Sequence, residues 1–218
     1  MSNISVVQTA VQASSLADRA YVAIRDLIVS LELPPGALID ERQLVESLDI
    51  GRTPVREALR RLSQEQLVEV FPRRGMFVTG VDVRDLARIS EVRSALEPEA
   101  ARLAAERATE EERDELVDLS NRIAPGADLM GLDEEIHRAI YKAAHNHLLE
   151  KTLSEYYVLA LRIWMIALER PEALEDAVEA HRDLIQEVAL GNGERAERLM
   201  RAHVQDFEAA MRRVLVAV

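Results

Sequence analysis

From Asp82 to its end, the sequence repeats apolar residues at helical spacing and offers no strand candidate. Residues that start or end helices interrupt this pattern at Ala108-Thr109, Pro125-Gly126, Asn146, Pro171 and Gly191-Asn192-Gly193. The interruptions predict six helices, over residues 83–107, 110–123, 129–145, 148–169, 172–190 and 193–216. Helices joined by such short connections, with no strand among them, predict an antiparallel all-α six-helix bundle over residues 81–218.

The first eighty residues follow a different pattern. Apolar residues from Leu16 to Leu31 predict a helix that must end before Pro34-Pro35-Gly36. Asp40 is a suitable cap for a second, short helix over residues 41–48. A tight turn over residues 49–51, in which we expect Gly51 to supply the permissive backbone, leads into a third helix from about residue 52. Two helices joined in this way predict a helix-turn-helix.

A β-hairpin is predicted directly after the third helix. Residues 67–71 and 76–79 have the composition of strands, and Pro72-Arg73-Arg74-Gly75 between them favours a turn. A basic-tipped hairpin in this position is typical of a wing. We therefore expect a winged helix-turn-helix over residues 15–80, after a disordered lead-in over residues 1–14.

Charge is distributed unevenly along the chain. The formal net charge is -12, yet residues 51–75 hold six arginines and only three acidic residues. Arg52, Arg56 and Arg60 recur every four residues and so share one face of the third helix. This row could be a solvated face balanced by Glu57 and Glu65. Beside a helix-turn-helix and a basic hairpin, it instead favours a surface for the DNA major groove and its flanking phosphates.

Several classes of protein are disfavoured by the sequence. There is no cysteine, which excludes disulfides and thiolate chemistry, leaves His, Asp and Glu as metal ligands, and favours the cytoplasm. Residues 1–14 lack the basic start and unbroken apolar core of a signal peptide. No apolar run reaches the ~20 residues needed to span a bilayer, so no membrane association is expected.

The five histidines suggest a metal site. Asp133 and His137 lie four residues apart and share a helix face. His181 and His203 each lie eleven residues from Asn192, so an antiparallel hairpin places them at the same level. Each histidine alone could be an ordinary hydrogen-bonded residue, but three imidazoles and a carboxylate together suit a divalent ion of the Zn, Ni or Mn class. His145 and His147 flank a helix break and are expected to be exposed.

The N-terminal region resembles a known DNA-binding domain. The run ERQLVESLDIGRTPVREALRRL, from Glu41 to Leu62, followed by RRGMFV, is similar to the winged helix-turn-helix of the GntR family of bacterial transcription regulators. The resemblance implies that DNA is contacted by Arg42, Arg52, Thr53 and Arg56 and by the wing tip at Arg74 and Gly75. Two positions depart from the family pattern: Gly51 replaces a usual Ser or Thr, and Gln66 replaces a usual Gly.

The remainder resembles the FCD ligand-sensing domain of the FadR subfamily, in its smaller VanR-type form. The similarity lies in VRSALEPEAA from Val92, in DEEIH, and in EAHRDLI continuing to MRAH. In metal-binding members, an Asp and three His hold a divalent ion, which corresponds here to Asp133, His137, His181 and His203. The resemblance also implies that Arg93 faces the same cavity, where a guanidinium suits a carboxylate. The alternative for Arg93 is an ion pair with Glu97 on its own helix.

These interpretations lead to one principal functional hypothesis. We expect a ligand-responsive repressor, a homodimer on a near-palindromic double-stranded operator, that senses a small carboxylate through a metal-containing pocket. A DNA-tethered metallohydrolase is the alternative, because such a metal set could activate water. No HExxH motif is present and no catalytic residue is assigned. A purely architectural DNA binder would leave the metal set unexplained.

Overall fold

The computed structural model describes residues 15–82, 84–124, 127–167 and 178–216. The chain divides after Val81 into an N-terminal unit and a C-terminal unit. Each is described by itself below.

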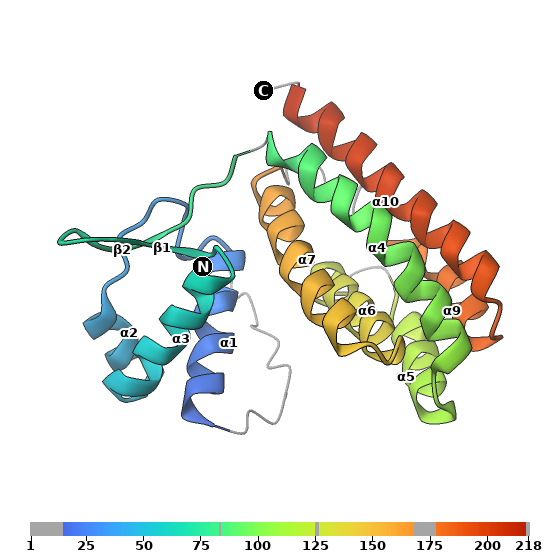
Figure 1. The fold of residues 1–218 in the computed structure, drawn as a ribbon, viewed down its shortest axis with the longest axis horizontal. Coiled ribbons are helices and arrows are strands. Elements are labelled where there is room, and N and C mark those ends of the chain that lie inside the picture. Colours follow the sequence, from blue (N-terminus) through green and yellow to red (C-terminus); the bar gives the residue numbers. More distant parts are fainter. Residues whose placement is uncertain (1–14, 83, 125–126, 168–177, 217–218) are drawn as a thin grey trace. The chain divides into compact units, whose positions relative to one another are not determined.

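The N-terminal unit is a winged helix-turn-helix, as predicted (Figure 1). It consists of α1 (Leu16–Val29), α2 (Glu41–Leu48), α3 (Arg52–Gln64), β1 (Val68–Phe71) and β2 (Gly75–Val78). The strands pair in antiparallel register, from Val68 opposite Val78 to Phe71 opposite Gly75. Fully buried residues of α1 and α3 form the core: Ala20, Ile24, Ile28, Val55, Ala58, Leu59 and Leu62. Asp40 caps α2, accepting hydrogen bonds from the backbone N–H groups of Arg42 and Gln43.

The turn between α2 and α3 differs from the prediction. Asp49, not Gly51, has the left-handed backbone, with φ of 52°. Gly51 is extended, and a Cβ there would meet only Pro54 Cδ at 3.9 Å. Aspartate tolerates the left-handed region because its short polar side chain can bond locally. Gly51 is therefore the N-cap of α3 without a capping side chain, and its conformation does not require glycine.

Gln66 ends α3 in a conformation that suits glycine. The Leu67 N–H donates to Leu62 O at 2.9 Å and the Gln66 N–H donates to Ser63 O at 3.2 Å, which is a Schellman motif. Gln66 lies at its left-handed position with φ of 61° and is exposed. The departure noted in the sequence therefore carries backbone strain that glycine would not.

We expect Gln66→Gly to raise the free energy of unfolding by about 1 kcal/mol, because glycine removes the left-handed penalty at this site. Gln64→Gly is the matched control: the same substitution at a helical position should lower it by about 0.5–1 kcal/mol. Urea denaturation of the full-length protein measures both. A lower free energy of unfolding in Gln66→Gly would show that the left-handed backbone at this position is not strained.

Helices joined by short connections make up the described part of the C-terminal unit, with no strand among these residues, which confirms the predicted bundle. Its helices are α4 (Asp85–Arg107), α5 (Glu110–Asn121), α6 (Leu129–Ala143), α7 (His147–Ala167), α9 (His181–Ala189) and α10 (Gly193–Val216). Helices α4 and α10 run side by side, and α4 also contacts α6, α7 and α9 (Figure 1). In the described parts of the chain, no helix combines the length and apolar character needed to cross a bilayer.

One predicted helix is interrupted. Of the helix expected over residues 172–190, residues 172–177 lie outside the described part of the chain. Val178 and Glu179 are helical, Ala180 is a turn residue, and α9 begins at His181. A continuous helix up to residue 190 was therefore a wrong prediction. Neither glycine nor proline marks the break in the sequence, and its effect is to make His181 the first residue of α9.

Helix α4 contains Pro98, which has no N–H to donate to the carbonyl of Ser94. Arg201 of α10 donates instead, from Nη1 to Ser94 O at 3.3 Å. This hydrogen bond joins α4 to α10 two residues before His203. The carbonyl that proline leaves without a helical partner is thus satisfied from the neighbouring helix.

Candidate metal centre and nucleic-acid interface

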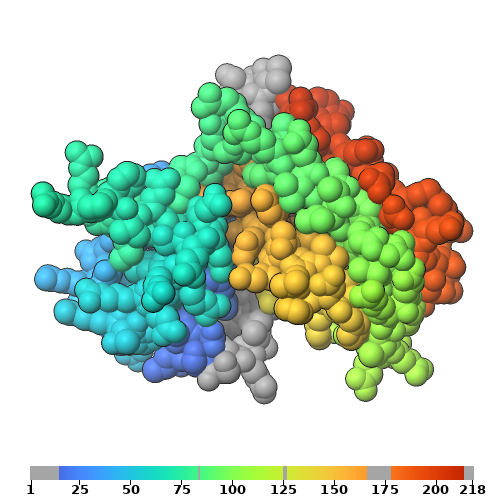
Figure 2. Space-filling view, viewed as in Figure 1, coloured from blue at the N-terminus to red at the C-terminus, as the bar shows by residue number. Residues whose placement is uncertain are grey.

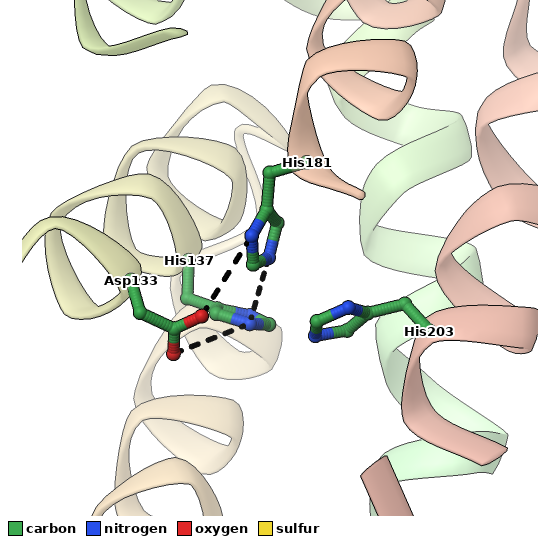
Figure 3. A group of neighbouring side chains, drawn as sticks. All are labelled: Asp133, His137, His181 and His203. Carbon is green, nitrogen blue, oxygen red and sulfur yellow. Dashed lines mark hydrogen bonds and ion pairs between the residues drawn. The ribbon is translucent and has the colours of Figure 1, made fainter. Parts of the chain in front are cut away.

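The structure brings the four predicted ligand residues together. Asp133 and His137 come from one face of α6, His181 from the start of α9 and His203 from α10, and their side chains converge (Figure 3). One donor atom from each residue lies within 4.8 Å of all the others. The imidazole rings of His181 and His203 have centroids 4.4 Å apart, as expected for residues at the same level of a hairpin. Gly191, with φ of 78°, makes the turn of that hairpin possible.

The spacing of the donor atoms fits a divalent ion. His181 Nδ1 lies 3.7 Å from Asp133 Oδ1, and His137 Nε2 lies 3.9 Å from Asp133 Oδ2. The other ring nitrogen of His181, Nε2, lies 3.3 Å from His137 Nε2, and one ion would take only one of these two nitrogens. Atoms that each bind one ion at ~2.0–2.2 Å are separated by ~3–4 Å. Within the described residues, His181 Nδ1 is buried and has no hydrogen-bond partner. A buried nitrogen of this kind facing a carboxylate is suited to a cation between them.

Burial sets the protonation of the cluster. It lowers the pKa of His137 well below its ordinary value, and the neighbouring His181 and His203 lower it further. Burial also lowers the pKa of His181 and of His203, although the latter keeps part of its surface exposed. The pKa of Asp133 is raised by burial. The imidazoles are therefore neutral near pH 7, which is the form that binds metal.

Two tyrosines contact the candidate ligand residues of α6. Tyr157 OH of α7 donates to Asp133 Oδ2 at 2.7 Å, and Tyr141 OH lies 3.1 Å from His137 Nδ1. The latter contact leaves Nε2 of His137 directed toward the cluster. Sequence analysis missed both residues. Tyr141 could have been found, because it lies four residues after His137 on the same helix face. Tyr157 is far away in sequence and has no such signal.

Arg93 was expected either to face the cavity or to pair with Glu97. Arg93 and Glu97 are 2% and 0% exposed, and Arg93 Nε donates to Glu97 Oε1. Glu97 Oε2 lies 3.7 Å from His137 Nδ1. Within the described residues, neither Nη atom of Arg93 makes a hydrogen bond. The arginine thus pairs with Glu97 and also lines the cavity beside the cluster.

That cavity is small. Its polar lining consists of Arg93, Asp133, His137, Tyr157 and His203, and its apolar lining of Ala160, Leu161, Trp164 and Phe207. Its volume is about 10 Å³, which is room for about one water molecule. A larger ligand therefore requires side chains of the lining to move.

The two other histidines lie apart from this cluster. His145 and His147 are both exposed, as expected. His145 Nε2 lies 2.8 Å from Glu112 Oε2 on the surface of the C-terminal unit. Neither histidine contributes to the candidate metal centre.

The residues expected to contact DNA all lie on the surface of the N-terminal unit. The exposed set comprises Arg42, Arg52, Thr53, Arg56, Arg74 and Gly75. Arg56 Nε donates to Glu41 Oε2 at 2.7 Å, so DNA would compete with an exposed ion pair for this guanidinium. The fully buried Val55 and Leu59 on the opposite face fix α3 against the core, so the arginine row faces outward.

The wing ends in a strained turn that presents its arginines. Arg74 N–H donates to Phe71 O at 3.0 Å, with Pro72 and Arg73 as the central residues. Arg73 has φ of 65°, which a type II turn requires at this position and which usually selects glycine or asparagine. The hairpin projects from the surface of the unit (Figure 2). Arg73, which sequence analysis left out of the DNA-binding set, is thus held beside Arg74 at the tip.

Known proteins share both units of this chain. The family described as "FCD domain" matches residues 88–206, and the family described as "Bacterial regulatory proteins, gntR family" matches residues 16–78. An "Uncharacterized HTH-type transcriptional regulator in unstable DNA locus" from Streptomyces ambofaciens is 32% identical over 85% of this chain and 80% of its own length. The "HTH-type transcriptional repressor RspR" of Escherichia coli (strain K12) is 26% identical over 89% of this chain and 88% of its own.

A solved structure agrees at the level of the fold. Escherichia coli McbR/YncC superposes with a TM-score of 0.78 at 24% identity, covering 91% of this chain and 98% of the other. The two domain matches occupy successive parts of the sequence, and the FCD match alone spans more than half of it. The chain therefore belongs to the gntR family of bacterial regulatory proteins, carries an FCD domain after its winged helix-turn-helix, and is a DNA-binding transcriptional regulator.

Proposed function

We propose that this regulator is a repressor that senses a small carboxylate through a divalent metal ion in its FCD domain. The observation that carries the proposal is the buried Asp133, His137, His181 and His203 cluster, which adjoins a cavity lined by Arg93. Its donor set and spacing support an ion of the Zn, Ni or Mn class. When bound, such an ion supplies a Lewis acid and positive charge for an anionic ligand.

The protein's own residues provide the rest of the proposed ligand site. Tyr157 and Tyr141 orient Asp133 and His137, while Glu97 holds Arg93 by its Nε atom. The Nη atoms of Arg93 are then left for the second contact of a carboxylate, to which a guanidinium can donate two hydrogen bonds. We expect ligand binding to alter the affinity of the winged domain for DNA through α4, which carries Arg93.

The proposed DNA complex is a homodimer on a near-palindromic operator. One winged domain reads only a few base pairs, and a two-fold pair of domains matches a two-fold DNA site. Residues Arg42, Arg52, Thr53, Arg56, Arg74 and Gly75 form the proposed contact surface. Binding stoichiometry and sedimentation of the complex test this arrangement, which requires two chains per operator.

Arg52→Ala is expected to weaken operator binding by about 1–3 kcal/mol, since an arginine bidentate to guanine contributes that much discrimination. Arg56→Ala should weaken binding less. In the wild type, DNA must first replace Glu41 as the partner of Arg56, so part of the binding energy from Arg56 is already offset. Fluorescence anisotropy with DNA selected from a random pool by the wild-type protein provides the measurement. Arg198→Ala, an exposed charge-matched change on α10, is the control. Wild-type affinity in Arg52→Ala would refute the assigned DNA-binding helix.

A metal-dependent hydrolase remains the second candidate. The observation in its favour is that the cavity has room for about one water molecule beside three imidazoles and a carboxylate. Incubation of metal-loaded protein with ester, amide and lactone substrates distinguishes the two functions. A ligand of a regulator is recovered unchanged, whereas turnover that depends on His181 would establish the enzyme.

A further inference from the structure

The cavity beside the metal cluster has an apolar wall. Ala160, Leu161 and Trp164 of α7 and Phe207 of α10 form this wall, and the Trp164 and Phe207 rings meet edge to face with centroids 5.4 Å apart. The polar lining groups belong to the cluster or adjoin it. Among the described lining residues, none is Ser, Thr, Asn or Gln. Apart from the indole N–H of Trp164, which can only donate, the wall offers no hydrogen-bond partner, so a ligand with several hydroxyl groups would bury most of them unpaired, which is costly.

The charges around the cavity leave room for one anionic group. Arg93 is the only Lys or Arg in the described lining, and the buried Glu97 already offsets its charge. Asp133 contributes one negative charge. With a divalent ion and neutral imidazoles, the site would carry a net charge of one positive unit. A single carboxylate balances this charge, whereas a second buried carboxylate would find no further cation among the described lining residues.

From this wall and this charge balance, we infer that the ligand is a monocarboxylate with an apolar body, as opposed to a polyhydroxylated or polycarboxylated acid. The inference rests on the proposed metal site and adds the chemical class of its ligand. The carboxylate would lie between the ion and Arg93, and the apolar body would lie against Trp164 and Phe207. Because the cavity now has room for about one water molecule, the body must displace these two side chains.

Trp164 is the single tryptophan of the chain, so its fluorescence reports on this wall alone. The test titrates zinc-loaded full-length protein with three six-carbon acids: hexanoate, gluconate and adipate. They share chain length but differ in hydroxyl groups and in the number of carboxylates. We expect hexanoate to change Trp164 fluorescence saturably and to bind at least about tenfold more tightly than the other two, as unpaired buried polar groups are penalised. Tighter binding of gluconate or adipate, or no response to any of the three, overturns the inference.

A matched pair of variants tests the wall itself. Ala160→Ser adds one hydroxyl to the cavity lining, and Ala143→Ser adds the same group to a buried position of α6 outside that lining. We expect only Ala160→Ser to weaken hexanoate binding, by several-fold. Equal hexanoate affinity in both variants and wild type would contradict contact with the wall.

Elemental analysis before each titration separates this inference from the proposed function. Protein that fails to take up zinc overturns the proposed metal site, and the ligand class falls with it. Zinc-loaded protein that prefers gluconate or adipate overturns only the ligand class and leaves the metal site standing.

Discussion

Protein carrying His181→Ala is expected to lose nearly all of the divalent ion that the wild type retains, about one per chain. Outer-sphere partners of metal ligands typically contribute ~10–100-fold to affinity, so the loss of one of four direct ligands should exceed that range. Elemental analysis after dialysis measures the content, and competition with a chromophoric chelator measures the affinity. The wild type should also lose stability on metal removal, by about 2.7 kcal/mol if the free ion had been at 100 times its Kd.

His145→Ala is the matched control for this change. His145 is exposed and pairs with Glu112 away from the cluster, so the substitution should leave the metal content unchanged. Binding to selected DNA should survive in both variants, because the N-terminal unit has its own core. Equal metal content per chain in the wild type and in a triple alanine variant of His137, His181 and His203 would show that the ion does not bind at this cluster.

Glu97→Ala should lower the free energy of unfolding by about 3–5 kcal/mol, because it leaves the buried guanidinium of Arg93 without its counter-charge. Burial alone would lower the pKa of Arg93, but Glu97 raises it above its ordinary value, so the arginine stays charged. Urea denaturation of the metal-loaded protein measures the loss. A change below 1 kcal/mol would show that water or another group can replace the carboxylate.

The same ion pair determines how the ligand role of Arg93 must be tested. Arg93→Ala alone would leave Glu97 buried without its partner, so a loss of response could reflect instability. The double variant Arg93→Met/Glu97→Leu removes both charges and should stay within about 2 kcal/mol of the wild type. It should retain metal but lose the response to carboxylate. Undiminished hexanoate affinity in this variant would show that the arginine does not contact the ligand.

Local sequence signals predicted much of this structure. Helical periodicity and helix-breaking residues placed α2 and α10 at their observed bounds, and Asp40 identified the start of α2. The prediction that His181 and His203 lie at the same level of a hairpin needed only the rise of a helix and the position of one turn. Helix bounds, a helix cap and the level of a hairpin are all decided by residues close together in the sequence, so a single sequence can reveal them.

Features decided by tertiary packing could not be predicted in this way. Asp49 and Gln66 occupy left-handed positions although neither is glycine, because the surrounding helices fix the turns. No residue at 178–180 signals the break before α9, and the contact of Tyr157 with Asp133 joins two helices. The sequence also suggested that Arg93 either pairs with Glu97 or faces the cavity, whereas in the structure it does both.

Pro98 makes α4 easier to bend at one point than along the rest of its length. The helical hydrogen bond to Ser94 O is already absent there, so a change of angle at this point costs one helical hydrogen bond fewer than elsewhere in α4. Buried residues lie on both sides of Pro98, with Leu86, Ile89 and Arg93 before it and the alanines at 100, 101, 104 and 105 after it. Helix α4 is therefore expected to bend more easily at Pro98 than an uninterrupted helix would. A ligand that displaces Arg93 would then bend α4 at this point, five residues away.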